Sequence, residues 1–83
     1  MDLRTYLFVN KMRANHISKL TGVRPNAIGN LINGKDQLTP LAALRVEKAT
    51  NGIVKATTTT DEEAWERFLE AVNMYKEFYE NAV

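Results

Sequence analysis

The sequence has no cysteine and only one histidine, His16, among its 83 residues. Without cysteine the chain has no disulfide framework, no thiolate metal site and no thiol nucleophile. A single histidine excludes the usual histidine-based metal clusters, and we interpret His16 as a surface or capping side chain rather than a ligand. No spacing of the remaining acids, bases and hydroxyls suggests a catalytic set. We therefore expect a protein that is not an enzyme and that needs no metal or other cofactor.

Long apolar runs are also absent. No run approaches the ~20 residues that a helix needs to cross a bilayer, and the opening stretch MDLRTYLFVNKM lacks the pattern of a cleavable signal peptide. We expect a cytoplasmic protein that makes no membrane contact. The hydrophobic content of 45% is nevertheless that of a folded domain. Because so short a chain builds only a small core, dimerisation is a reasonable expectation.

The net charge of +1 conceals two regions of opposite sign. Residues 1–60 contain nine lysines and arginines against three acids, a net charge of +6, whereas residues 61–83 contain two bases against seven acids, a net charge of −5. A basic body with an acidic appendage is typical of a domain that binds a polyanion and directs its last segment elsewhere.

Glycine and proline are scarce, with four and two copies, and most of them stand where a helix is expected to begin or end. Gly22 suits the left-handed residue that follows a helix, because glycine adopts that backbone conformation without steric cost. Pro25 and Pro40 suit the first turn of new helices, the latter after Thr39 as N-cap. Short helices are therefore predicted at about residues 2–11, 14–21, 25–32 and 40–50.

The end of the chain differs in pattern. Residues 56–60, within the β-branched stretch IVKATTTT, are interpreted as a linker, with a short strand through Ile53 and Val54 as the alternative. Thr60 and Glu63 form a capping-box pattern, after which a helix is predicted from Asp61 to about Asn81. Large apolar residues recur along it at three- and four-residue spacing: Trp65, Phe68, Leu69, Val72, Tyr75, Phe78 and Tyr79. We therefore divide the chain into a domain at 1–55, the linker and a C-terminal helix at 61–83.

The segment ISKLTGVRPNAIGNLINGK, residues 17–35, places a helix, a glycine turn and a second helix in succession. This is the helix-turn-helix arrangement, in which the second helix enters the DNA major groove. The segment resembles the motif of the phage Cro and lambda-repressor superfamily, and LAALRVEKATNGIV resembles the helix that follows the motif in small Cro-like and YdaS-like regulators. The matching positions are Ile17, Gly22, Val23, Ile28, Leu31, Asn33, Gly34 and Lys35. The resemblance covers about residues 2–55.

The resemblance implies an all-α, lambda-repressor-like bundle of four to five short helices, here followed by the long amphipathic C-terminal helix. It also implies which residues contact DNA. Base contacts are expected from the start and next turn of the second motif helix: Arg24, Pro25, Asn26, Ala27 and Asn30. Phosphate contacts are expected from positions flanking the two helices: Arg13, Ala14, Asn33 and Lys35. Amide and guanidinium groups match the base edges exposed in the major groove.

The implied function is transcriptional regulation, as a Cro-like phage or prophage repressor that binds double-stranded DNA. We expect a homodimer on a two-fold-related operator, with the apolar residues of the C-terminal helix at the dimer interface. Two alternatives remain open for that helix, which either folds back on its own domain or binds another protein. In the latter case the protein is either a DNA-binding antitoxin whose last helix wraps a toxin, or a protein-interaction module whose helix-turn-helix has lost DNA affinity.

Overall fold

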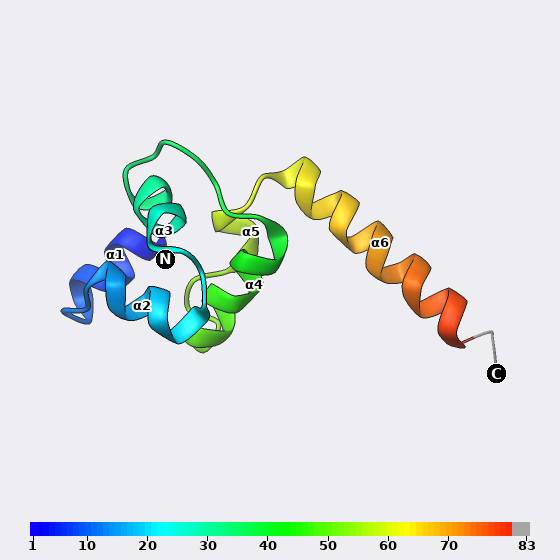
Figure 1. Ribbon diagram of the computed structural model, residues 1–83, viewed down its shortest axis with the longest axis horizontal. Coiled ribbons are helices and arrows are strands. Elements are labelled where there is room, and N and C mark those ends of the chain that lie inside the picture. The colour runs from blue at the N-terminus through cyan, green and yellow to red at the C-terminus, as the bar shows by residue number, and fades with distance from the viewer. Residues whose placement is uncertain (81–83) are drawn as a thin grey trace.

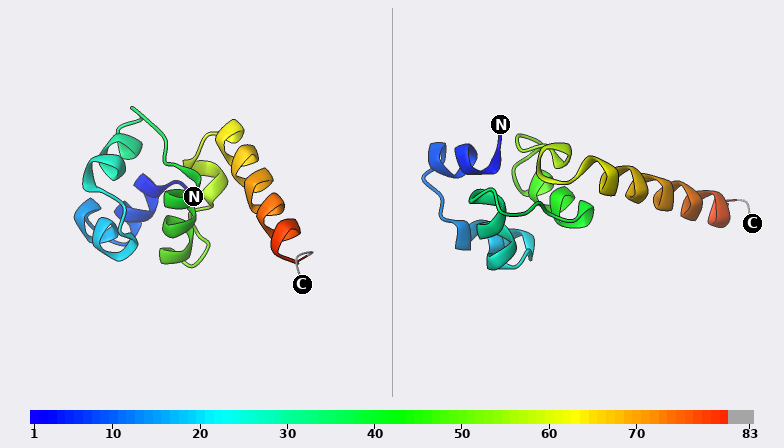
Figure 2. Two further views of the ribbon diagram at one scale, coloured as in Figure 1. Left: turned by 45° about the vertical axis from the view of Figure 1, so that its right-hand side comes forward. Right: turned by 90° about the horizontal axis from the view of Figure 1, so that it is seen from above.

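The computed structural model describes residues 1–80, and over that part of the chain every regular element is a helix, which confirms the all-α prediction. The elements are α1 (Leu3–Val9), α2 (Ala14–Thr21), α3 (Pro25–Ile32), α4 (Pro40–Ala49), α5 (Ala56–Thr59) and α6 (Glu62–Glu80). Helices α1 to α5 gather into one body, and α6 extends away from it (Figure 1). The molecule is therefore elongated, measuring 48 × 22 × 20 Å along its principal axes. Both views in Figure 2 show α6 starting beside the α5 segment and running on past the rest of the body.

The core lies inside the body, where each of the first five helices contributes apolar side chains. Ile17 on α2, Ile28 on α3 and Val46 on α4 are completely buried. Burial of one such side chain contributes about 1.5–3 kcal/mol. The remaining core residues are Leu3, Leu7, Val23, Leu38, Ala43, Val54 and Ala56. In contrast, none of the described residues of α6 is buried, so this helix adds little to the core beyond Trp65, which packs against it.

The helix ends follow local signals that are visible in the sequence. Asp2 caps α1 by accepting a hydrogen bond from the backbone N–H of Thr5 at 2.7 Å. Gly22 follows α2 with a positive φ of 73°, and Pro25 opens α3. Thr39 caps α4 through its side chain, with Pro40 at the first helical position. These features confirm the predicted starts and ends of α2, α3 and α4 to within about a residue.

The segment at residues 56–60 is not an exposed linker. It forms the short helix α5, and Ala56, Thr59 and Thr60 are buried. The backbone N–H of Ala56 donates to Glu47 Oε1 at 2.8 Å, and that of Leu38 donates to the Thr59 carbonyl at 2.8 Å. These two hydrogen bonds, made to residues outside the segment, hold residues 56–60 in a defined conformation. The sequence of the segment itself has no helical pattern. No strand runs through residues 53–54 in the described part of the chain.

The start of α6 also differs from the expected capping box. Asp61 Oδ2, rather than Thr60, accepts a hydrogen bond at this end, from the backbone N–H of Ala64 at 3.1 Å. Thr60 is unsuited to the role because its backbone forms a bridge with Leu38 and its side chain is buried. The predicted helix end at about Asn81 lies outside the described residues, as do residues 82–83 of the expected C-terminal helix. Between residues 1 and 80, no helix combines the length and apolar character needed to span a membrane.

Candidate nucleic-acid interface

The turn between α2 and α3 is held by side chains of α2. Gly22 takes the left-handed conformation, and both backbone groups of the buried Val23 are bonded by hydroxyls. Ser18 Oγ donates to the Val23 carbonyl, and Thr21 Oγ1 accepts from the Val23 N–H at 3.1 Å. Thr21 Oγ1 also donates to the Ile17 carbonyl at 2.7 Å. Because buried backbone groups are costly to leave unpaired, these bonds fix the direction in which α3 leaves the turn.

Helix α3 has one buried side and one exposed polar side. Ile28 is completely buried, and Ala27 is half-buried beside it. Of the residues predicted to contact bases, Arg24, Asn26 and Asn30 are exposed, as is Pro25 at the first helical position. The predicted guanidinium and amide groups are therefore all accessible to solvent, whereas Ala27 is less accessible.

The segment after α3 folds back on the helix end. The carbonyl of Asn30 accepts hydrogen bonds from the backbone N–H groups of Lys35 and Asp36, at 2.8 and 3.3 Å. Gly34 permits this reversal with a φ of 70°. As a result Asn33 and Lys35, both exposed, stand next to the end of α3 rather than at a distance from it. Two of the predicted phosphate-contact residues are thus adjacent to the predicted base-contact surface.

A basic depression of about 400 Å³ lies at the start of α2. Its lining residues are Lys11, Met12, Arg13, Asn15, His16 and Lys19. Arg13 is the N-cap residue of α2 but makes no side-chain cap hydrogen bond, and Ala14 begins the helix half-buried. The start of a helix attracts anions through its free N–H groups and the helix dipole. Lys11 and Arg13 at this helix start, with Lys19 further along α2, therefore form a basic surface suited to a phosphate group.

Lys11 and Lys19 of this depression were not among the predicted phosphate contacts. Lys11 reaches it because it adopts a positive φ of 51° in the tight turn after α1, which no sequence pattern indicates. The available signal was the local spacing of Lys11, Arg13 and Lys19, three cations within nine residues. Among residues 1–80 the one ion pair joins Arg67 to Glu63 on α6, so within the described residues no cation of the body is held in an ion pair.

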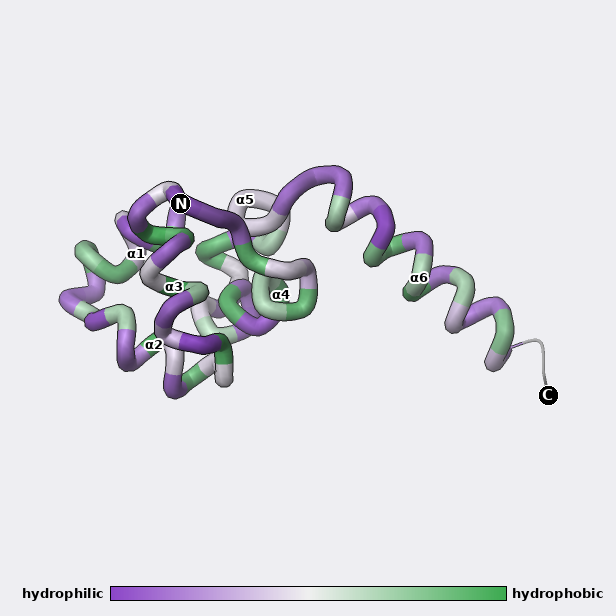
Figure 3. Tube along the Cα trace, turned by 45° about the horizontal axis from the view of Figure 1, so that its top comes forward, coloured by the Kyte–Doolittle hydropathy of each residue, from purple (hydrophilic) through white to green (hydrophobic). Residues whose placement is uncertain are grey.

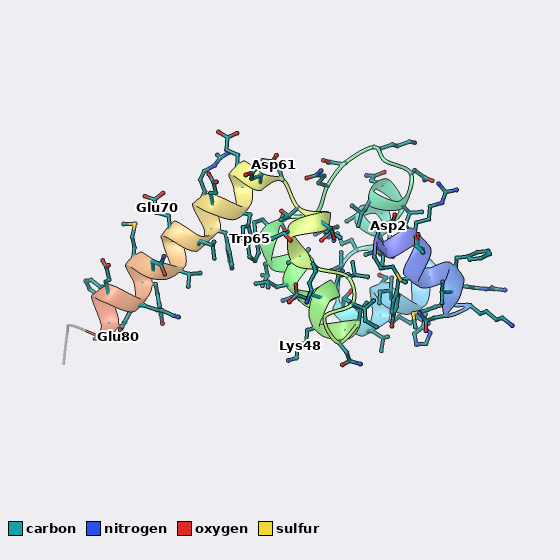
Figure 4. All side chains as sticks on the ribbon, turned by 180° about the vertical axis from the view of Figure 1, so that it is seen from behind. Asp2, Lys48, Asp61, Trp65, Glu70 and Glu80 are labelled. Atoms are coloured by element: carbon teal, nitrogen blue, oxygen red, sulfur yellow. The ribbon has the colours of Figure 1, made fainter. Side chains whose placement is uncertain are left out.

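The apolar residues of α6 divide into two groups. Trp65, Phe68 and Val72 are half-buried, with the Trp65 and Phe68 ring centroids 5.7 Å apart, and Trp65 packs against the core of the body. The other four apolar residues are exposed: Leu69, Tyr75, Phe78 and Tyr79. Figure 3 shows apolar segments recurring along this helix between hydrophilic ones. In Figure 4 Trp65 points toward α4, whereas Glu70 points to the opposite side of α6.

Comparison with protein-family models, with curated proteins and with solved structures gives no match to this chain. Within the described residues, no group of three or more histidine, aspartate and glutamate side chains is arranged to hold a metal ion. The exposed residues of α2 and α3 and the apolar side of α6 are the candidate functional surfaces of the described chain.

Proposed function

We propose that this protein is a sequence-specific, double-stranded DNA-binding transcriptional regulator with a lambda-repressor-like fold. The observation that carries the proposal is the exposure of three polar side chains at the start and along α3, those of Arg24, Asn26 and Asn30, together with the basic depression lined by residues of α2. In this reading α2 and α3 are a helix-turn-helix motif, and α3 enters the major groove. Because that groove is wide enough for one helix, the exposed side of α3 meets the base edges directly.

Base reading and phosphate binding fall to different residues. Asparagine pairs bidentately with adenine and arginine with guanine, each pair contributing about 1–3 kcal/mol of discrimination against a wrong base. Asn26, Asn30 and Arg24 have these roles. Phosphate contacts, which set register and salt-dependent affinity, fall to the depression around Arg13 and to Lys35 beyond α3. The body's charge of +6 over residues 1–60 supports the approach to DNA.

We further propose that the regulator is a cytoplasmic homodimer, paired through the apolar side of α6, that binds an operator with two-fold symmetry. The acidic residues of α6 keep this helix away from the phosphates, since like charges repel. Repression, as in a phage or prophage switch, is the sense of regulation that the Cro-like resemblance implies. No enzymatic activity or cofactor is part of this function.

The test is selection from a random duplex library with purified protein at moderate salt, followed by sequencing of the retained DNA. We expect an enriched motif with two-fold symmetry. Asn30→Ala is expected to relax the preference at one position of each half-site by about 1–3 kcal/mol. Asn73→Ala, an exposed asparagine on α6, is the matched control and is expected to leave the motif unchanged. A folded protein that enriches no sequence contradicts the proposal.

A second candidate function rests on the exposed aromatic rings at the distal half of α6. Phe78 is 69% exposed and Tyr75 63% exposed, which is unusual for aromatic residues of a monomer. An antitoxin or interaction module would present this surface to a different protein. An interaction module without DNA affinity is expected to bind duplexes weakly and without sequence preference, so the same selection separates it from the regulator. An antitoxin would still bind DNA and is distinguished by its protein partner.

A further inference from the structure

His16, the one histidine of the chain, lines the basic depression at the start of α2. It is the third residue of that helix, and its backbone N–H donates to the Arg13 carbonyl at 3.0 Å. Because Arg13 is the N-cap residue, His16 has the surface position expected of it and not the capping one. The charged residues that line the depression with it are Lys11, Arg13 and Lys19, and all four are exposed.

The carboxylates of residues 1–60 lie elsewhere. They belong to Asp2, Asp36 and Glu47, none of which lines the depression. Each accepts a hydrogen bond from a backbone N–H at 2.7 or 2.8 Å. The acidic residues that follow are on α6, which runs away from α1 and α2 (Figure 1). An anion that neutralises the depression therefore comes from outside the described chain.

We propose that His16 contacts DNA phosphate at this depression, and that it does so as an imidazolium ion. The proposal rests on the DNA-binding function proposed above, and adds one residue and one proton to it. A neutral imidazole has one N–H donor and one acceptor nitrogen, whereas the imidazolium has two donors. A phosphate oxygen carries negative charge and only accepts, so it pairs with the imidazolium in a charge-assisted hydrogen bond.

DNA binding and protonation of His16 are thereby coupled. An opposite charge nearby favours the charged form of a group, and at His16 the phosphate supplies that charge. Lysine and arginine stay charged near neutral pH, so the other three cations attract phosphate throughout this range. Histidine is the side chain that ordinarily changes its charge there. DNA affinity is therefore expected to rise as the pH falls from about 8 to about 6.

The first test measures affinity for the selected duplex at about pH 6, 7 and 8 and constant ionic strength. The native protein is expected to bind about two- to fivefold more tightly at the lowest pH, the range of an exposed ion pair. His16→Gln keeps a neutral side chain of similar size, and is expected to bind at low pH only as tightly as the native protein does at high pH. His16→Lys is charged throughout, and is expected to bind at high pH about as tightly as the native protein does at low pH.

The matched control combines His16→Gln with Asn73→His. It returns a titratable imidazole to the chain at an exposed position of α6, away from the depression. We expect this protein to behave like His16→Gln, because its imidazole meets no phosphate. The terminal amine also titrates near the upper end of the pH range. Any pH dependence that persists in His16→Gln measures this background, which is subtracted from the native value.

The second test counts protons directly. Calorimetric titration of the protein with duplex near neutral pH, in two buffers of different ionisation enthalpy, gives the number of protons taken up on binding. The native protein is expected to take up a fraction of a proton per chain, and His16→Gln and His16→Lys none. The slope of log K against log salt is expected to be steeper at low than at high pH by up to about one, because a protonated His16 releases one further counterion.

The outcomes separate this inference from the function on which it rests. Native affinity without pH dependence, or a dependence that His16→Gln retains in full, overturns the role of His16 and leaves DNA binding standing. Failure of the folded native protein to bind duplex at any pH overturns both proposals. All variants are expected to keep the native helical circular dichroism, because His16 and Asn73 are exposed. Loss of pH dependence in His16→Gln, with high affinity at every pH in His16→Lys, supports the phosphate contact.

Discussion

The backbone N–H of Leu38 donates a 2.8 Å hydrogen bond to the carbonyl oxygen of Thr59, so two segments far apart in sequence lie side by side. Leu38 belongs to the segment that follows α3, and Thr59 ends α5 directly before α6. A bridge between Leu38 and Thr60 continues the pairing. The candidate DNA-contact segment around Lys35 and the base of α6 are therefore joined through one short backbone pairing.

Replacement of Leu38 by alanine tests the energetic weight of this junction. The Leu38 side chain is only 4% exposed, so Leu38→Ala removes buried methyl groups and leaves a cavity. The free energy of unfolding is expected to fall by about 2–5 kcal/mol. Leu20→Ala, at a residue that is 56% exposed, is the control and is expected to change stability by about 0.5 kcal/mol or less. Urea denaturation at one fixed protein concentration measures both, and equal losses would show that the junction is not part of the core.

The two glycines of the α2–α3 unit are expected to respond oppositely to alanine. Gly22 has a φ of 73°, so Gly22→Ala forces an unfavourable left-handed residue and is expected to cost about 1–2 kcal/mol. Gly29 lies inside α3, and a methyl group there meets no atom within 4 Å. Gly29→Ala is expected to stabilise the protein by about 0.5–1 kcal/mol. Thermal unfolding of both variants gives the sign, and a stabilising Gly22→Ala would contradict the described turn.

The elements that sequence reasoning located correctly are those defined by neighbours in the chain. Gly22 after α2, and Thr39 with Pro40 before α4, act within a few residues of themselves, so their effect is readable from the sequence. The α2–α3 turn was located on the same grounds. The hydrogen bonds of the Ser18 and Thr21 hydroxyls that hold it were not predicted. A serine or threonine hydroxyl can bond several nearby backbone groups, and the sequence does not show which of them it bonds.

The features that sequence reasoning missed depend on distant contacts. Helix α5 forms where Ala56 meets Glu47 and Thr59 meets Leu38, and neither pairing leaves a local pattern. Recruitment of Thr60 into that junction moves the cap of α6 to Asp61. The position of Lys11 beside Arg13 likewise depends on the tight turn after α1. The predicted interface role of the apolar residues of α6 stays a prediction until the oligomeric state of the protein is measured.

The N-terminus offers a prediction about pH. The hydrogen bonds from Thr5 hold the pKa of the Asp2 carboxyl below its ordinary value. A group whose pKa is lowered by folding stabilises the native state above its unfolded pKa and loses that effect as the pH falls through its folded pKa. Asp2→Asn keeps a good N-cap but does not titrate. The difference in Tm between the native protein and Asp2→Asn is therefore expected to shift in favour of the variant on acidification. A difference that is constant with pH would contradict this.

The basic depression at the start of α2 predicts how DNA affinity depends on salt. If Lys11 and Lys19 contact phosphates beside Arg13, each releases counterions when DNA binds. Lys11→Ala and Lys19→Ala are each expected to lower affinity for all sequences alike and to reduce the slope of log K against log salt by about one. Lys76→Ala on α6 removes an equal charge away from the depression and is expected to leave the slope unchanged. Titration of the selected duplex at several salt concentrations measures these slopes. If the Lys76 variant lowers the slope as much as the other two, the effect comes from overall charge, and the depression is not a phosphate site.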